Sequence, residues 1–263
     1  MNKKTSIGAL LKKHVASRLE PLGFEYQGSV APNTWQFKKC AKYDQLIHFE
    51  KSNFVQGIRF DLSTSKSIEP RVYDRALRAF DDISMWSEYQ NEQELETVLT
   101  ELTDLLIDKG LKVLSLLGED EIRPTGQMHL DLYDNSLSYA QKFINQHPHI
   151  EGLDPIDSLE EIQALLKSLD SYPECTGVLM SISAYLGEML KNRFNWRWEW
   201  FPKFSFTVVI GDNLAYAVQP LKWVMEYWNK PDLVIYNMVN RYRALEYSIR
   251  SREESLKNTT YLK

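Results

Sequence analysis

Three of the five histidines lie among carboxylates in one acidic stretch of the chain. Imidazole nitrogens and carboxylate oxygens together are a ligand set for zinc, manganese or iron. The sequence therefore offers one catalytic hypothesis, an uncharacterised metal-dependent hydrolase that uses this cluster. Its members are His129, Asp131, Asp134, His147, His149, Glu151 and Asp154.

The same histidines also have a simpler interpretation. His129 and Asp131 alternate with apolar residues, which is typical of the solvated face of a strand or turn. His147 and His149 flank a proline at the end of a short helix expected over 135–146, where exposed histidines are common. We favour this interpretation, so no metal and no cofactor is expected.

Other catalytic chemistry finds little support. Walker-type Gly-rich loops, a dinucleotide fingerprint, Gly-x-Ser-x-Gly, His-Glu-x-x-His and Cys-x-x-Cys are absent from the sequence. Cys175 precedes an apolar helix, whose N-terminus would lower the pKa of the thiol. No histidine is tied to Cys175 or Cys40 by a local pattern, so buried structural cysteines are the better interpretation.

The most unusual local feature is the run Trp196-Arg197-Trp198-Glu199-Trp200. On a strand, the three indoles share one face, while the two charged residues share the other. We interpret it as a core strand that packs against the preceding helix. The alternative is a partly exposed aromatic patch that anchors a protein or stacks on bases or sugars.

Charge is distributed unevenly along the chain. The net charge is −5, and residues 119–175 carry 3 Lys or Arg against 12 Asp or Glu. This does not fit a generic nucleic-acid binder, which needs a broad basic face. The acidic stretch would suit a basic protein partner, although a solvated surface is an equal interpretation. The residues expected to bind such a partner are Asp154, Asp157, Glu160, Glu161, Trp196, Arg197, Trp198 and Glu199.

These residues must be positioned by helices and strands. The pattern of the sequence predicts an α+β fold in two units, each with helices packed on a small antiparallel sheet. The chain of 263 residues has a globular composition with 43% hydrophobic residues. In the first unit, 1–118, apolar spacing predicts a helix over 7–22, a four-strand meander, and a helix from 95 to Gly110. An acidic connector is expected over 119–155.

The second unit is expected over 156–263. A capping box, Ser158 with Glu161, predicts the start of one helix, and a second should run over 177–191. Alternating residues predict strands over 196–200, 204–210 and 214–218, with a turn at 211–213. A final helix should begin near Pro231.

Two stretches resemble bacterial domains of unknown function. The first, Leu19 to Ser52, has a helix ending in Leu-Gly-Phe, a strand with Trp35 and Phe37, and a strand ending in Phe-x-Lys-Ser. The second combines Tyr-Leu-Gly-Glu at 185–188, a tryptophan at 196 or 198, and Gln-Pro-Leu at 219–221. Together the two stretches cover about half of the chain.

The resemblance implies a place near polymorphic toxin systems, where some members act as immunity or accessory proteins. It carries over no catalytic residue. At the matching positions it implies that Gly187 allows close helix packing and that Glu188 pairs with Arg197. The chain departs from the pattern at 195–198, where one tryptophan after a Gly-rich turn is expected.

We therefore expect a non-enzymatic protein-binding protein, in its specific form an immunity protein that masks the active site of a basic toxin. The sparse cysteines favour the cytoplasm. The chain has neither an apolar run long enough to span a membrane nor a signal-peptide core. The oligomeric state is left open.

Overall fold

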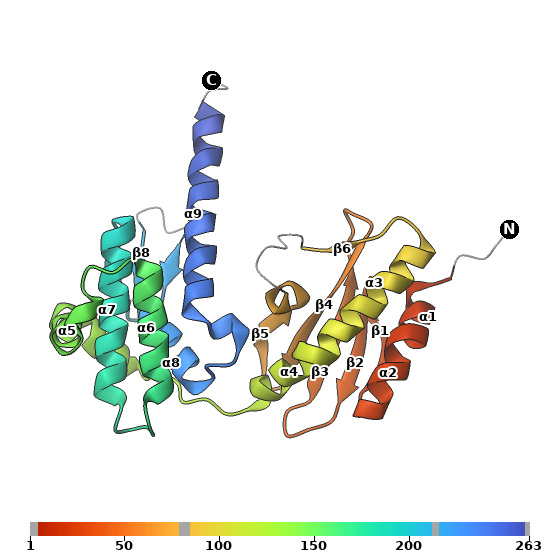
Figure 1. Cartoon of the computed structure of the whole chain (residues 1–263), viewed down its shortest axis with the longest axis horizontal. Helices are drawn as coiled ribbons and strands as arrows, with labels where there is room; N and C mark the ends of the chain where they lie inside the picture. The colour runs from red at the N-terminus through yellow and green to blue at the C-terminus, as the bar shows by residue number, and fades with distance from the viewer. Residues whose placement is uncertain (1–4, 79–84, 212–215, 261–263) are drawn as a thin grey trace. The chain divides into compact units, whose positions relative to one another are not determined.

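A computed structural model of the chain describes residues 5–78, 85–211 and 216–260. The chain divides into two compact units, unit 1 (Met1–Asp120) and unit 2 (Glu121–Lys263) (Figure 1). Each unit combines helices with an antiparallel sheet, so the α+β class is confirmed. Among the described helices, none combines the length and apolar character needed to cross a membrane.

Unit 1 opens with the expected helix and sheet. Ser6 caps α1 (Ile7–Leu11), and the helix continues through a π-turn, α2 (Ser17–Leu19) and a 3-10 turn as far as Leu22. Gly23 ends it with a φ of 88°, a left-handed conformation that glycine adopts without strain. The sheet follows as β1 (Glu25–Ala31), β2 (Thr34–Lys39), β3 (Gln45–Lys51) and β4 (Gly57–Thr64), the four expected strands.

The sheet has two further strands. β5 (Ser67–Tyr73) follows β4 in the order β1-β2-β3-β4-β5, and the short β6 (Ser87–Glu88) pairs with the other end of β4. The sequence pattern does not predict β5, because Pro70 lies in its middle and proline argues against a strand. β5 is the last strand in this order, and a proline is tolerated in such an edge strand.

The second helical segment of unit 1 is longer than predicted. Asn91 caps α3 (Glu92–Leu105), a π-turn follows, and α4 (Leu111–Gly118) continues the helix. The expected end at Gly110 is wrong, because its φ of −65° is helical. A Cβ on this glycine would lie 3.3 Å from the Leu62 side chain, so the glycine allows the helix to approach the sheet closely.

Unit 2 begins where the acidic connector was expected. Residues 119–155 instead hold the long helix α5 (Gly126–Gln146), which bends at Asn135 and packs within unit 2. The alternation around His129 therefore belongs to a helix and not to a strand. The buried stripe of α5 is His129, Leu132, Ser136, Ala140 and Phe143, whose spacing is helical.

Three helices and a small sheet complete the unit. α6 (Pro155–Ser168) begins one turn before the predicted Ser158, because Asp154 accepts a hydrogen bond from the Ile156 amide and caps it. α7 (Thr176–Phe194) agrees with its prediction and buries residues on several sides. The sheet has the order β7 (Arg197–Phe201), β8 (Phe206–Ile210) and β9 (Ala217–Val218). Residues 212–215 of the predicted turn and third strand lie outside the described residues.

The end of the chain differs most from expectation. α8 (Pro220–Asn229) is not predicted, and α9 (Met238–Thr260) begins seven residues after Pro231.

The start of unit 2 is tied to the end of α8. The Lys230 ammonium, 1% exposed, contacts the Glu121 carboxylate at 2.6 Å, and the Tyr236 hydroxyl donates to the same oxygen at 3.1 Å.

Candidate functional site

The Trp-rich run forms the beginning of the sheet in unit 2. Asn195 ends α7 in the left-handed conformation, with a φ of 54°, and so turns the chain into β7. Trp198, Trp200 and Trp196 are all half-buried, and Trp196 and Trp198 pack against the core of the unit. The prediction of a core strand against α7 is thus met, and some area of each indole stays at the surface.

Trp198 is positioned by two consecutive residues of α7. A Cβ on Gly187 would lie 2.0 Å from Cζ2 of the indole, so the ring occupies the space above this glycine. The indole Nε1 donates to Oε1 of Glu188 at 2.8 Å. Gly187 therefore makes room for an indole, whereas the resemblance implied that it makes room for a helix.

Glu188 has a different set of partners from the one that the resemblance implied. Besides Trp198, its carboxylate accepts hydrogen bonds from the Lys191 ammonium at 2.6 Å and from the Ser136 hydroxyl at 3.4 Å. Arg197 contacts Glu199 on the same strand at 3.3 Å. These two charged side chains are 49% and 42% exposed, and the alternation of the strand places them on the face opposite the indoles.

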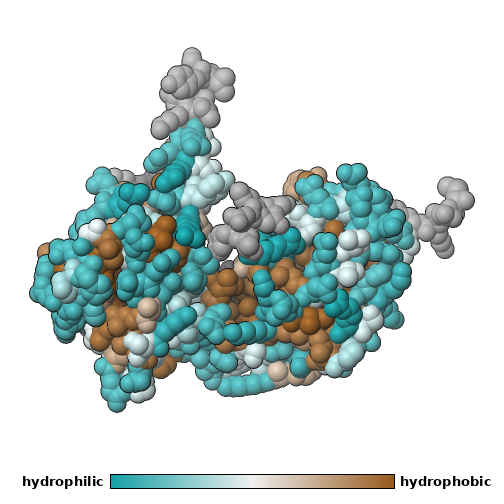
Figure 2. All heavy atoms as spheres, in the orientation of Figure 1, coloured by the Kyte–Doolittle hydropathy of each residue, from teal (hydrophilic) through white to brown (hydrophobic). Residues whose placement is uncertain are grey.

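The expected acidic residues gather on α6. Asp154, Asp157, Glu160 and Glu161 are all exposed, at spacings of three and four residues that place them along one face of the helix. The opposite face is buried in the core of the unit through Leu159, Ile162 and Leu166. Figure 2 shows hydrophilic and hydrophobic surface side by side around α6 and α7.

The acidic and aromatic groups lie at one end of unit 2. Figure 1 shows the start of α6 and the end of α7 at the same end. Phe194 contacts Trp196, with ring centroids 5.1 Å apart, and also contacts Tyr242, at 6.1 Å. Burial raises the pKa of the Tyr242 hydroxyl, and the negative charges of Glu246 and Asp154 raise it further. We call this end of the unit, with α6 and the start of β7, the acidic end.

The histidines of the metal hypothesis do not come together. An α-helix rises about 1.5 Å per residue, so His129 and His147 lie roughly 27 Å apart along α5. His129 is 4% exposed and accepts a hydrogen bond from the Thr207 amide, and burial lowers its pKa to about 4. Within the described residues, no group of three or more His, Cys, Asp or Glu side chains is placed to hold a metal ion.

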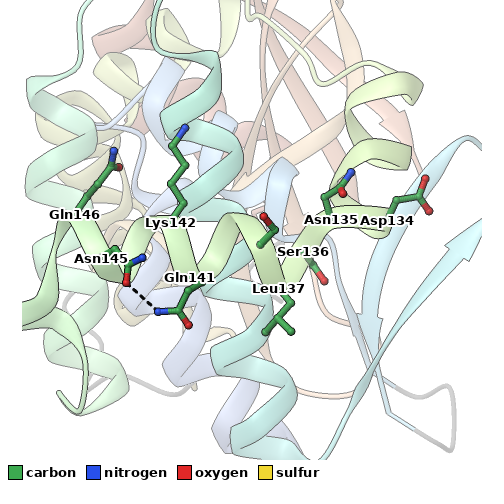
Figure 3. Close-up of a pocket in the computed structure, with 9 residues that line it drawn as sticks. Asp134, Asn135, Ser136, Leu137, Gln141, Lys142, Asn145 and Gln146 are labelled. Atoms are coloured by element: carbon green, nitrogen blue, oxygen red, sulfur yellow. Dashed lines mark hydrogen bonds between the residues drawn. The ribbon is translucent and has the colours of Figure 1, made fainter.

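The remaining members of that cluster have other contacts. Asp131 accepts hydrogen bonds from Tyr139 at 2.7 Å and from Asn135 at 2.8 Å. His149 is 4.0 Å from Glu161 on the acidic face of α6. Asp134 lines a hollow of about 860 Å³ along the bend of α5 (Figure 3). All the walls of this hollow come from one helix, so it does not enclose a small molecule as a ligand pocket does.

The two cysteines differ in burial. Cys175 is buried, and this burial raises the pKa of its thiol, contrary to the lowering that a helix N-terminus would produce. Cys40, which directly follows β2, is exposed, so the expectation of a buried cysteine is wrong at this position.

A charged network on the sheet of unit 1 was not singled out from the sequence. His48 Nδ1 lies 3.2 Å from the Asp61 carboxylate, which is completely buried. Arg59 lies between the rings of Tyr73 and Trp86, at 4.3 and 4.2 Å, and also donates to Glu50.

The sequence does carry one signal for this network. His48 and Glu50 alternate with Ile47 and Phe49, and this alternation indicates a polar face of a sheet. The pairing of its charges follows only from the register of β3 and β4. Arg71 lies 3.6 Å from Asp61 and 3.8 Å from Glu50. Because its carboxylates lie beside arginines, we interpret the network as structural.

Comparison of the chain with family models, with curated proteins and with solved structures gives no match.

Proposed function

We propose that the chain is a non-enzymatic protein-binding protein whose acidic end binds a partner with a basic surface. The observation that supports the proposal is the arrangement of carboxylates on α6. Asp154, Asp157, Glu160 and Glu161 are exposed on one face, and the core needs only the opposite face.

The carboxylates on α6 repel one another. Asp157 lies three residues before Glu160 and four before Glu161, and like charges at these spacings destabilise a helix by about 0.2–0.5 kcal/mol per pair. Asp157 alone lies in the first turn of the helix, where a negative charge interacts favourably with the helix dipole. A cationic partner surface would relieve the repulsion and would be attracted from a distance, which speeds association.

The aromatic residues supply the other part of an interface. Protein interfaces combine aromatic side chains at the centre with a polar margin. At the acidic end, half-buried Trp196 and Trp198 lie on one face of the strand, and the ion pair of Arg197 and Glu199 lies on the other. The indoles are held by the core, so a partner would meet them already ordered.

In its specific form, the proposal makes the partner a basic toxin that acts on nucleic acid and makes the chain its immunity protein. The acidic face would then cover the basic surface that such a toxin needs for its own phosphate contacts. This form also rests on the resemblance of two stretches to domains near toxin systems. It fails if no toxin-like gene lies beside the gene for this chain and the native host yields no partner.

Affinity capture from the native host tests the proposal. The test variant is Asp157→Asn, Glu160→Gln and Glu161→Gln, which keeps the Asp154 cap. The matched control is Asp170→Asn, Glu253→Gln and Glu254→Gln, which removes the same charge from other exposed positions of unit 2. We expect wild type and control to retain one basic protein that the test variant loses. A partner retained by all three proteins would contradict the proposal.

A further inference from the structure

The loop between β3 and β4 presents a phenylalanine to solvent. Phe54 is 97% exposed and its neighbour Val55 is 41% exposed. The loop is fixed, because the buried Ser52 hydroxyl accepts hydrogen bonds from the amides of both residues, at 3.1 and 3.2 Å. The Gly57 amide also donates to the Val55 carbonyl. An ordered, exposed aromatic side chain of this kind is typical of interface anchors.

A pocket of about 540 Å³ lies directly beside Phe54. Its lining includes the buried side chains of Leu10, Tyr89 and Leu95, which offer it apolar surface. The β3–β4 loop and the starts of α1 and α3 lie at the same end of unit 1 (Figure 1). Phe54 itself lines the pocket, so an apolar projection and an apolar recess share one edge.

Two opposite charges line the same pocket. Lys51 lies at the end of β3 and Glu92 at the start of α3. Within the described residues neither side chain forms an ion pair, and the Glu92 carboxylate accepts a hydrogen bond from the Thr5 amide at 3.4 Å. The surface therefore carries a projection, a recess, a positive charge and a negative charge together.

We propose that this end of unit 1 is a self-association surface for a second copy of the chain. In a two-fold dimer each surface contacts its own copy, so each feature must meet its complement on the same patch. A two-fold axis beside the pocket places each Phe54 over the pocket of the other copy. It also places Lys51 of one copy opposite Glu92 of the other, and each pocket is completed by a residue of the second copy.

The oligomeric state of the purified full chain tests the proposal, measured by sedimentation equilibrium over a range of concentrations. Wild type is expected to form a dimer, and Phe54→Asp is expected to weaken it by about tenfold or more. Phe204→Asp is the control, because Phe204 is 62% exposed but lies in unit 2. A wild-type monomer at all concentrations, or a Phe54→Asp dimer as strong as wild type, would overturn the proposal.

A charge exchange gives a second test that does not depend on an apolar residue. Lys51→Glu and Glu92→Lys should each weaken the dimer, because each places like charges opposite one another. The double variant should restore it, which loss of folding cannot imitate. If the double variant is as weak as the two single variants, the proposed pairing is wrong. A monomer that instead binds a different protein through Phe54 would also overturn self-association. None of these variants alters α6, so the outcome is separate from that of the proposed function.

Discussion

The indole of Trp198 fills the space that a side chain at position 187 would need, and its N–H donates to the neighbouring Glu188. Two consecutive residues of α7 thus determine where β7 lies against the helix. This contact positions the aromatic part of the acidic end.

Gly187→Ala should therefore destabilise unit 2 although alanine is the better helix former. The new methyl group overlaps the Trp198 ring, and overpacking of this kind costs about 3 kcal/mol. Gly177→Ala is the control on the same helix, because nothing lies within 4 Å of its added Cβ, and it should stabilise by about 0.5 kcal/mol. Urea unfolding followed by tryptophan fluorescence measures both, since five of the seven tryptophans lie in unit 2. Equal effects of the two substitutions would refute the contact.

Glu188 should matter as a hydrogen-bond acceptor more than as a charge. Glu188→Gln keeps an oxygen for the Trp198 N–H and loses the ion pair with the half-exposed Lys191, so we expect a loss of about 1 kcal/mol. Glu188→Ala leaves the indole N–H without its acceptor and should cost about 1–3 kcal/mol more. The same unfolding experiment ranks the two variants. If Gln and Ala are equally harmful, the charge dominates.

His129 should make unit 2 less stable in acid. Its pKa is lowered to about 4 in the folded state, against an ordinary value of 6.5. The unfolded chain takes up a proton below pH 6.5 that the folded state accepts only near pH 4. The free energy of unfolding should therefore fall across this window by about 3 kcal/mol in total.

The variant His129→Asn separates this titration from packing. The asparagine oxygen can still accept from the Thr207 amide, but the side chain does not titrate. Between pH 6.5 and pH 4, the free energy of unfolding of this variant should decrease by less than that of wild type. His149→Asn, at a side chain 61% exposed, is the control for replacing a histidine at the surface. An unchanged pH dependence in His129→Asn would show that another group is responsible.

The buried ion pair of Lys230 and Glu121 should hold the first residues of unit 2 in place. Lys230→Met leaves the Glu121 carboxylate without its cation and should cost about 3–5 kcal/mol. Adding Glu121→Gln removes the uncompensated charge and should recover part of that loss. Chemical unfolding of the single and double variants gives the comparison. A double variant less stable than Lys230→Met would contradict this account.

Much of the fold can be predicted from the sequence where the pattern is local. The strands β1 to β4 alternate clearly, and Gly23 and α7 carry plain signals. The start of α5 is hidden because two members of its buried stripe, His129 and Ser136, are polar and mask the helical period. α8 is short and follows a strand almost directly, so the sequence has no loop that would mark the start of a helix.

The candidate site also has one part that local sequence predicts and another part that it does not. The acidic face of α6 follows from helical spacing alone, because Asp157, Glu160 and Glu161 belong to one helix and Asp154 caps it. The contact of Trp198 with Gly187 is between a strand and a helix. It depends on how the two elements pack, which the sequence pattern does not specify. His48 and Asp61 likewise lie on neighbouring strands whose register the sequence does not specify.

The affinity of the captured partner for the Asp157→Asn, Glu160→Gln, Glu161→Gln variant tests the central claim most directly. Measured by titration calorimetry at several salt concentrations, binding should weaken by about tenfold or more relative to wild type, with a smaller dependence on salt. The control with Asp170, Glu253 and Glu254 neutralised should bind like wild type. Wild-type affinity and salt dependence in the α6 variant would contradict binding through the acidic end.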